Sequence, residues 1–305
     1  MTSNSDKKML HITNLKKRFG EKEVLKNLEL SVPEHSIFGF IGKNGAGKTT
    51  TMKIILGLLQ PDDGAVYVAG TRVTYGQSAS NHFVGYLPDV PEFYPFMTAP
   101  EYLTFCGEIT GMPRSEIAQY SRELLELVGL GGETHRIKGF SRGMKQRLGI
   151  AQALLNRPRL LICDEPTSAL DPVGRKEILD ILSSVRAHTT VLFSTHILSD
   201  VERICTDAAF LKDGVVSIQG TLADIKAAYR SKEYRIELEL ESDIPALINT
   251  FGHCKKLEKN QVTLRDDGNA LYDVLQYITA RKIPIQKIER MEPSLEDLFM
   301  EVVEK

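Results

Sequence analysis

The sequence predicts an α/β fold, and three observations carry this prediction. Apolar strands alternate with helical segments along most of the chain. One such strand, residues 37–41, runs into a glycine-rich loop and then into a helix. Two further strands, residues 160–163 and 190–195, have the apolar composition of buried parallel strands and end in charged side chains. In open α/β sheets, ligand chemistry gathers at this carboxyl end of the strands.

The glycine-rich loop has the G-x-x-x-x-G-K-T spacing of a phosphate-binding loop. Its glycines let successive backbone N–H groups turn toward the phosphates of a nucleotide. We expect Lys48 to reach the β- and γ-phosphates and the Thr49 hydroxyl to ligate Mg²⁺. The following helix, with apolar residues at helical spacing as far as Leu59, directs its positive N-terminal end at the phosphates. The predicted nucleotide-binding residues of the loop are Gly42, Lys43, Asn44, Gly45, Ala46, Gly47, Lys48, Thr49 and Thr50.

The strand of residues 160–163 leads into Asp164 and Glu165. Two carboxylates at a buried strand end are costly without a cation, so we expect Asp164 to bind Mg²⁺ that also contacts the nucleotide phosphates. Glu165 is then free to activate the attacking water as a general base. The alternative, that the pair only begins a turn before Pro166, is disfavoured by the phosphate-binding loop upstream. The strand of residues 190–195 ends in His196 at the same predicted sheet edge.

Composition excludes several classes of protein. The 305 residues carry a net charge of −2 with 26% charged side chains, which indicates no general polyanion-binding surface. Four cysteines without C-x-x-C spacing favour a reducing, cytosolic compartment and no structural zinc site. The longest strongly apolar stretch, residues 54–59, is far too short to cross a bilayer, and the N-terminus lacks the apolar core of a signal peptide. Work at a membrane would need another chain to supply the span.

A helical insert interrupts the alternation of strands and helices. It begins with a capping box at Thr98 and Glu101 and continues through predicted helices at 102–109 and 116–128. We expect a subdomain at about residues 93–158. Within it, Ser141 and Gly143 stand at the start of a predicted helix, where a short hydroxyl and a bare glycine would form a second anion site. A simple helix cap explains Ser141 alone equally well.

Taken together, these segments resemble the ATP-binding subunit of ABC transporters over residues 9–219. The run Ser141-Arg142-Gly143-Met144-Lys145-Gln146 resembles the family's signature motif, which caps the γ-phosphate of the ATP held by the partner subunit. Phe19 matches the aromatic residue that stacks on adenine, and His196 matches the switch histidine that senses the γ-phosphate. Residues 168–171 look like the loop that crosses the dimer interface.

The resemblance implies a P-loop NTPase core of the ABC ATPase type, with an antiparallel β subdomain and a helical subdomain, over residues 9–228. It implies binding and hydrolysis of ATP with Mg²⁺, and it assigns catalysis to Glu165, His196 and Lys48. The expected function is to power transport, in the direction of export, through a separate integral-membrane permease. Two copies would pair when ATP binds, and no nucleic acid is an expected partner. The resemblance places the chain in the cytoplasm, on the inner face of the cell membrane through the permease.

Two positions depart from the family pattern. Arg142 stands where the family more often has glycine. Asp89 stands where the family usually has a glutamine that contacts Mg²⁺ and relays motion to the membrane partner. A carboxylate can still ligate Mg²⁺, so the predicted metal ligands are Thr49, Asp164 and Asp89.

Residues 229–305 predict a small α+β domain. Tyr234, Ile236, Leu238 and Leu240 alternate with charged residues as in a half-buried strand, and further strand and helix patterns follow to the end of the chain. This part has no catalytic constellation, and the neighbours His253 and Cys254 lack further ligands for a metal. Residues 293–299 resemble the ending of many bacterial ATPases of drug- and peptide-export systems.

Two other classes of function remain as alternatives. One is a soluble ABC-type ATPase that acts on nucleic acid or ribosomes, but such proteins usually carry a coiled-coil insert or two cassettes, and neither pattern is present. The other is a nucleotide-gated binding protein without turnover. The presence of both Glu165 and His196 argues against it.

Overall fold

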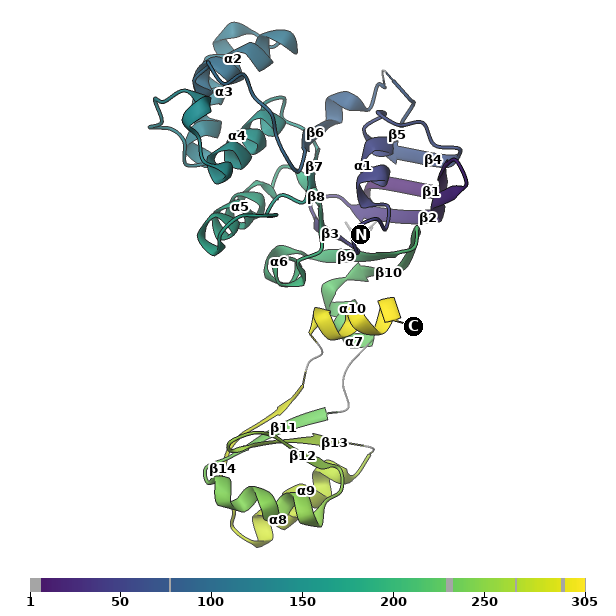
Figure 1. Ribbon diagram of the computed structural model, residues 1–305, viewed down its shortest axis with the longest axis vertical. Coiled ribbons are helices and arrows are strands. Elements are labelled where there is room, and N and C mark those ends of the chain that lie inside the picture. Colours follow the sequence, from purple (N-terminus) through teal and green to yellow (C-terminus); the bar gives the residue numbers. More distant parts are fainter. Residues whose placement is uncertain (1–6, 77, 229–232, 267, 292–293, 305) are drawn as a thin grey trace, which may run out of the picture. The chain divides into compact units, whose positions relative to one another are not determined.

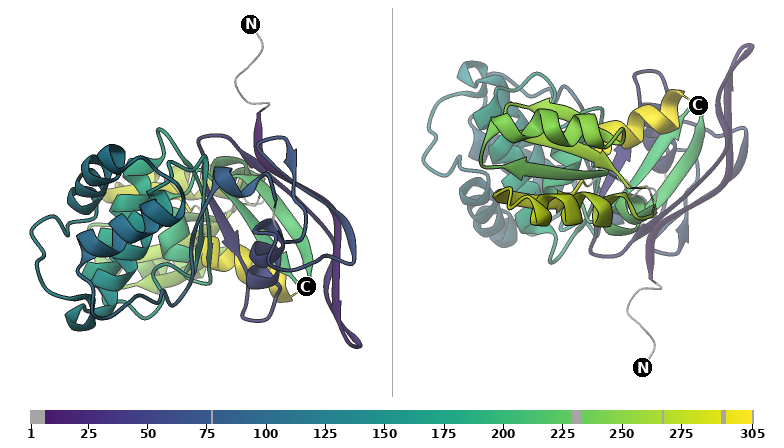
Figure 2. Two further views of the ribbon diagram at one scale, coloured as in Figure 1. Left: turned by 90° about the horizontal axis from the view of Figure 1, so that it is seen from above. Right: turned by 90° about the horizontal axis from the view of Figure 1, so that it is seen from below.

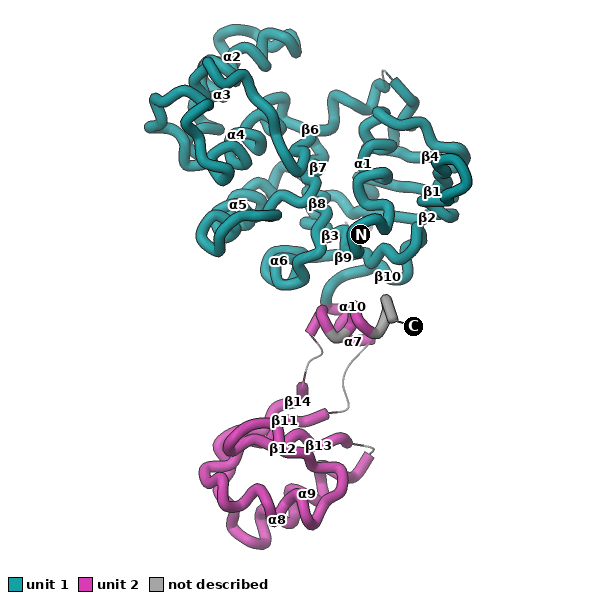
Figure 3. Tube along the Cα trace, in the orientation of Figure 1, with its two compact units in different colours: residues 1–222 teal, residues 223–305 magenta. Residues whose placement is uncertain are grey.

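The computed structural model describes residues 7–76, 78–228, 233–266, 268–291 and 294–304. The chain forms two compact units, which divide between Leu222 and Ala223 (Figure 3). The predicted division after residue 228 falls at the end of helix α7 (Leu222–Ala228), and residue 229 lies outside the described residues. Among the described residues, no helix has both the length and the apolar composition needed to span a membrane.

A six-stranded sheet forms the centre of the first unit, in the order β10-β9-β3-β8-β7-β6. Five of its strands are parallel, and β10 pairs antiparallel with β9 at the edge. Every residue of β3, β7 and β8 is buried, as their apolar sequences predict. The strands are β3 (Ile37–Ile41), β6 (Val84–Leu87), β7 (Leu160–Asp164), β8 (Thr190–Thr195), β9 (Asp207–Lys212) and β10 (Val215–Thr221).

Helices and a second sheet cover the two faces of this sheet. Helix α1 (Lys48–Ile55) lies between it and an antiparallel sheet of order β2-β1-β4-β5, whereas α5 (Pro172–Val185) and α6 (Leu198–Ile204) lie on the opposite face (Figure 1). The core between the two sheets joins residues of both sheets and of α1, including Leu28 of β2, Phe40 of β3 and Met52 of α1. The antiparallel strands are β1 (Lys8–Phe19), β2 (Lys22–Pro33), β4 (Asp63–Val68) and β5 (Thr71–Arg72).

Two local expectations were wrong. Helix α1 ends at Ile55 rather than continuing to Leu59, because the N–H of Leu58 bonds back to the carbonyl of Lys53 at 2.9 Å and closes the helix with a capping turn. The sequence of residues 65–73 alternates as a single half-exposed strand would, but these residues form a hairpin of β4 and β5, because Ala69 adopts a left-handed backbone conformation with φ of +49°.

The helical subdomain consists of α2 (Ala99–Ile109), α3 (Arg114–Leu127) and α4 (Arg142–Leu154). Its predicted capping box is confirmed, since Glu101 Oε2 accepts from the N–H of Thr98 at 2.8 Å and Thr98 Oγ1 accepts from the N–H of Glu101 at 3.5 Å. Buried side chains from all three helices hold the subdomain together. They include Leu103, Ile117, Leu124 and Leu148.

The second unit has strand–helix–strand, strand–helix–strand connectivity around a four-stranded antiparallel sheet of order β12-β13-β11-β14, which is a ferredoxin-like arrangement. Both α8 (Ile244–Thr250) and α9 (Ala270–Ala280) lie on one face of the sheet (Figures 1 and 2). Ile236, Val262 and Val274 pack together in the core between them. The strands are β11 (Glu233–Leu238), β12 (Cys254–Glu258), β13 (Gln261–Arg265) and β14 (Ile285–Arg290), and α10 (Leu295–Glu304) ends the chain.

The helical subdomain meets the central sheet through a close backbone approach at Gly85 of β6. A Cβ built on Gly85 would lie 2.1 Å from the carbonyl oxygen of Ala153 in α4. Backbone atoms cannot give way as the end of a side chain can, so α4 would have to move away from β6. This glycine therefore sets the distance between the sheet and the signature helix.

We expect Gly85→Ala to lower the free energy of unfolding by about 1–3 kcal/mol, as overpacking of a tight interior usually does. Thermal unfolding measures the change. Gly132→Ala is the matched control, because a Cβ there meets no atom within 4 Å. Equal unfolding temperatures for the two variants would contradict the close-approach argument.

Candidate functional site

The glycine-rich loop turns sharply between β3 and α1. Gly47, the residue before the helix, has φ of +115°, and a Cβ there would lie 2.7 Å from Leu25 Cδ2, so both conformation and space require glycine. The loop wraps around the lysine that follows it. Lys48 is only 5% exposed, and its Nζ donates to the carbonyl of Gly42 at 2.6 Å. The ammonium group is thereby held inside the loop.

A cavity of about 330 Å³ lies at this loop. The phosphate-binding loop forms one side of it, and Asp89, Asp164 and Glu165 also line it. A larger groove of about 480 Å³ adjoins it at Asp89 and is lined further by residues of the helical subdomain. The larger volume contains no residue of the glycine-rich loop, so the smaller cavity is the candidate site for phosphate chemistry.

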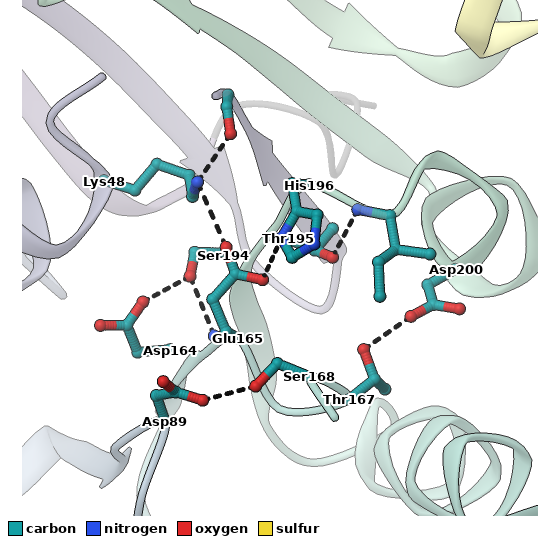
Figure 4. A network of polar contacts seen from close by, with 12 residues as sticks. Lys48, Asp89, Asp164, Glu165, Thr167, Ser168, Ser194, Thr195, His196 and Asp200 are labelled. Atoms are coloured by element: carbon teal, nitrogen blue, oxygen red, sulfur yellow. Dashed lines mark hydrogen bonds and ion pairs between the residues drawn. The ribbon is translucent and has the colours of Figure 1, made fainter. Parts of the chain in front are cut away.

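Asp164, the last residue of β7, is 5% exposed and accepts from two hydroxyls. Thr49 Oγ1 donates to its Oδ2 at 2.9 Å. Ser194 Oγ of the neighbouring strand β8 donates to its Oδ1 at 2.6 Å (Figure 4). No ion pair formed within the described ranges includes this carboxylate. Burying an ionised carboxylate without a cation is costly, and carboxylate and hydroxyl oxygens are ligands that Mg²⁺ prefers. The Asp164 carboxylate and the Thr49 hydroxyl therefore fit a divalent cation as ligands.

Glu165 has a strained backbone, with φ of +47°, and its side chain turns back toward the loop. Its Oε2 lies 2.9 Å from His196 Nδ1, and its Oε1 lies 3.2 Å from Lys48 Nζ (Figure 4). Oε1 is buried and accepts no hydrogen bond from the described residues, although the lysine charge is near. The N–H of Glu165 donates to Ser194 Oγ at 3.0 Å, which fixes the start of the turn.

The loop after Glu165 is held at two consecutive residues. Thr167 Oγ1 donates to Asp200 Oδ2 of α6 at 2.6 Å, and Ser168 Oγ donates to Asp89 Oδ1 at 2.5 Å (Figure 4). Asp200 is buried, and its burial raises the pKa of the carboxyl above its usual value. The predicted interface loop is thus tied both to the helix that follows His196 and to the end of β6.

The structure brings together most of the predicted residues, but not all of them. Lys48, Thr49, Asp164, Glu165 and His196 converge at one edge of the sheet, as parallel strands with charged ends predict. Ser194, Thr167 and Asp200 complete the network and were missed. The available signal was a polar residue inside an apolar strand for Ser194 and a carboxylate one helical turn after His196 for Asp200.

Six predicted residues lie outside the cavity lining: Phe19, Gly42, Ala46, Ser141, Gly143 and His196. Gly42, Ala46 and His196 belong to the loop and the strand end beside the cavity, whereas the other three lie elsewhere. Phe19 is half-exposed at the end of β1, where Lys17 Nζ lies 5.5 Å from its ring centroid. Ser141 is the N-cap of α4, and its Oγ accepts from the N–H of Met144 at 3.2 Å. Gly143 lies two residues further on, and a Cβ built there would meet Ser141 Oγ only at 4.0 Å. Within the described chain, neither Ser141 nor Gly143 lines the cavity at the chain's own phosphate-binding loop.

Comparison with known families matches both units. Residues 25–168 match the family model described as "ABC transporter", and residues 220–303 match that described as "ATP-binding protein DrrA1-3-like, C-terminal domain". The second match covers almost the whole ferredoxin-like unit. The two matches follow the division seen in the structure.

Curated relatives are similar over nearly the full length. An uncharacterized ABC transporter ATP-binding protein of Bacillus subtilis, YxlF, is 37% identical, with 97% of this chain and 99% of the relative covered. The bacitracin transport ATP-binding protein BcrA of Bacillus licheniformis is 33% identical with 97% of each covered. The linearmycin resistance ATP-binding protein LnrL of Bacillus subtilis is 31% identical, with 96% and 97% covered. The alternative of an ATPase acting on nucleic acid finds no support among them.

Solved structures agree with the fold of the first unit. An ATP-binding subunit of an ABC transporter is 33% identical with a TM-score of 0.62, and it matches 72% of this chain and 93% of its own. An ATP-binding cassette solved as a dimer bound to ADP and Pi is 27% identical with a TM-score of 0.63, and the match covers 70% of this chain and 99% of that one. With the loop, the carboxylates and the histidine in place, the chain belongs to the ATP-binding proteins of ABC transporters and is an ABC ATPase.

Proposed function

We propose that this chain is the ATP-hydrolysing subunit of an export system and that hydrolysis takes place in the cavity at the phosphate-binding loop. The observation that carries the proposal is the position of Glu165, whose carboxylate lies between Lys48 and His196 at the end of β7. Phosphoryl transfer to water is promoted by a group that orients the water and takes its proton, and by cations that neutralise the charge on the phosphates.

Each side chain has a separate task in this proposal. Lys48 binds the β- and γ-phosphates, whose charge competes with Glu165 Oε1 for the ammonium group. Thr49 and Asp164 hold Mg²⁺, which when bound neutralises charge on the phosphate oxygens. Ser194 keeps Asp164 in position through the hydrogen bond to Oδ1. Asp89 lines the same cavity and stays a predicted metal ligand.

Glu165 is the general base. As the water oxygen bonds to the γ-phosphorus, the bond between that phosphorus and the oxygen it shares with the β-phosphate breaks, and the water proton passes to the Glu165 carboxylate. Oε1 becomes available for this proton when Lys48, whose Nζ lies 3.2 Å from it, binds the phosphates instead, since Oε1 accepts no hydrogen bond from the described residues. His196 holds the other oxygen at 2.9 Å and so orients the carboxylate.

A second copy of the chain would complete the site. The N-cap Ser141 and the N–H groups at the start of α4 form an anion site that lines no part of the chain's own cavity. A twofold pair of chains would present each α4 to the other chain's nucleotide. The dimeric relative bound to ADP and Pi supports this arrangement.

Transport needs a membrane partner. None of the described helices can span a bilayer, so we assign the channel to an integral-membrane permease and place this chain on its cytoplasmic side. Export is the proposed direction, since relatives similar over the full length are named for bacitracin transport and linearmycin resistance. The match of the second unit to a DrrA-like C-terminal domain accords with this class.

The first test of the mechanism is Glu165→Gln. The variant should bind MgATP like the wild type but hydrolyse it about 10²–10⁴-fold more slowly, because it has lost the base and kept its hydrogen-bonding shape. Single-turnover hydrolysis and equilibrium binding measure the two effects separately. Glu116→Gln, on an exposed face of α3, is the control and should turn over normally. Near-normal hydrolysis by Glu165→Gln would remove Glu165 from this role.

The second test concerns the shared site. Glu165→Gln protein should run as a dimer in sizing chromatography with MgATP and as a monomer with ADP, because ADP lacks the γ-phosphate that both chains would bind. Mixing Lys48→Ala chains with Ser141→Arg chains should recover part of the activity. In the mixed dimer one site carries both defects and the other carries none.

Two results would contradict the shared site. One is a hydrolysis-slow variant that stays monomeric in saturating MgATP with the permease present. The other is full activity of Ser141→Arg chains on their own, since an arginine side chain at the N-cap would then leave the anion site intact. Unmixed Lys48→Ala and Ser141→Arg preparations are the controls for the recovery experiment.

A further inference from the structure

The two positions at which this chain departs from the family pattern contact each other. Arg142 Nη2 lies 3.7 Å from Asp89 Oδ1. Ser168 joins the pair, because its Oγ donates to the same Asp89 oxygen at 2.5 Å and accepts from Arg142 Nη2 at 3.4 Å. The three side chains come from the end of β6, the start of α4 and the loop after β7. Asp89 thus places a carboxylate where the family usually has a neutral glutamine, and Arg142 places a guanidinium where the family more often has glycine.

The backbone beneath this cluster is held by a buried side chain. Gln146, one turn further along α4, is 1% exposed and donates from Nε2 to the carbonyls of Asp89 and Pro166, each at 3.2 Å. The segments that carry Asp89, Arg142 and Ser168 are therefore positioned independently of the charges. Removal of one charge should leave this arrangement in place and change mainly the electrostatics.

Asp89 faces the nucleotide site. It lines the cavity at the phosphate-binding loop and also the adjoining groove, so its charge lies at the boundary between them. Lys138 and Lys145 line the groove as well, but within the described chain the ion pair of Asp89 is with Arg142. A carboxylate beside a site for polyphosphate would repel the ligand, because like charges at short range disfavour each other.

We propose that Arg142 neutralises Asp89 within the same chain, so that the nucleotide meets a site without the added negative charge. The pair replaces the usual neutral glutamine and glycine as a unit. Arg142 is then a positioning residue for nucleotide affinity, acting through Asp89. The inference rests on the proposed function, since it takes nucleotide to bind in the cavity at the phosphate-binding loop.

The test is a double-substitution cycle read by equilibrium binding. Arg142→Gln, Asp89→Asn and the double variant are titrated with ADP and with ATP in EDTA, so that neither Mg²⁺ coordination nor the ATP-bound dimer enters the ADP measurement. Arg142→Gln should weaken ADP binding about fivefold, the size expected of a partly exposed charge pair. The double variant should bind like the wild type, and Arg142→Lys should recover most of the loss.

Two further readouts separate charge from structure. The loss in Arg142→Gln should shrink in about 1 M salt, where the Debye length is about 3 Å. Arg147→Gln is the matched control, because it removes the same charge from the same helix, where Arg147 pairs with Glu177 at 3.6 Å and lines neither cavity. It should bind ADP like the wild type.

The inference is overturned if the double variant shows the summed losses of the single ones, or if Arg147→Gln weakens ADP binding as much as Arg142→Gln. It is also overturned if Arg142→Gln leaves ADP binding unchanged and affects only the ATP-bound dimer, since Arg142 would then act on the partner's nucleotide. Failure of the proposed function looks different. In that case Lys48→Ala would bind ADP and ATP as well as the wild type does.

Discussion

The placement of two adjacent carboxylates at the end of β7, Asp164 buried and Glu165 partly buried, is the constraint on which the rest of the site depends. Asp164 is almost inaccessible to solvent, and Glu165 follows it with a left-handed backbone. Neither charge is tolerable there without partners. The parallel sheet supplies them, because β3 leads into the loop that carries Lys48 and Thr49, and β8 brings Ser194 and then the histidine at its end. The order of the parallel strands therefore determines which side chains surround the two carboxylates.

The loop after β7 links this arrangement to the rest of the unit. Thr167 is bonded to α6, which begins just after His196, and Ser168 is bonded to Asp89 beyond β6. A change at either strand end therefore acts on a segment that also carries the predicted dimer contacts. Because the Asp200 carboxyl is buried, water cannot take the place of the Thr167 hydroxyl as its hydrogen-bond donor. The link between the histidine segment and the interface loop is correspondingly firm.

Sequence alone predicted those features that depend on neighbours in the chain. The strand–loop–helix order around Lys48, the charged strand ends and the capping box at Thr98 all follow from local patterns, and the structure contains them. The contacts that sequence missed join residues far apart in the chain, such as Thr167 with Asp200. Local boundaries failed where a conformation has no compositional signal, as at Ala69, whose left-handed turn splits the expected strand. The ferredoxin-like strand order of the second unit likewise could not be predicted, because it depends on which strands pair with each other.

The same limit applies to reading a motif one residue at a time. Judged separately, Asp89 is a carboxylate in place of a neutral ligand, and Arg142 is a long side chain in place of glycine. Their contact changes that judgement, because each charge is the compensation for the other. Gln146 holds the two backbone segments at the distance that makes the compensation available. Asp89 and Arg142 should therefore be compared with other sequences as a pair, because the electrostatic effect of either residue depends on the other.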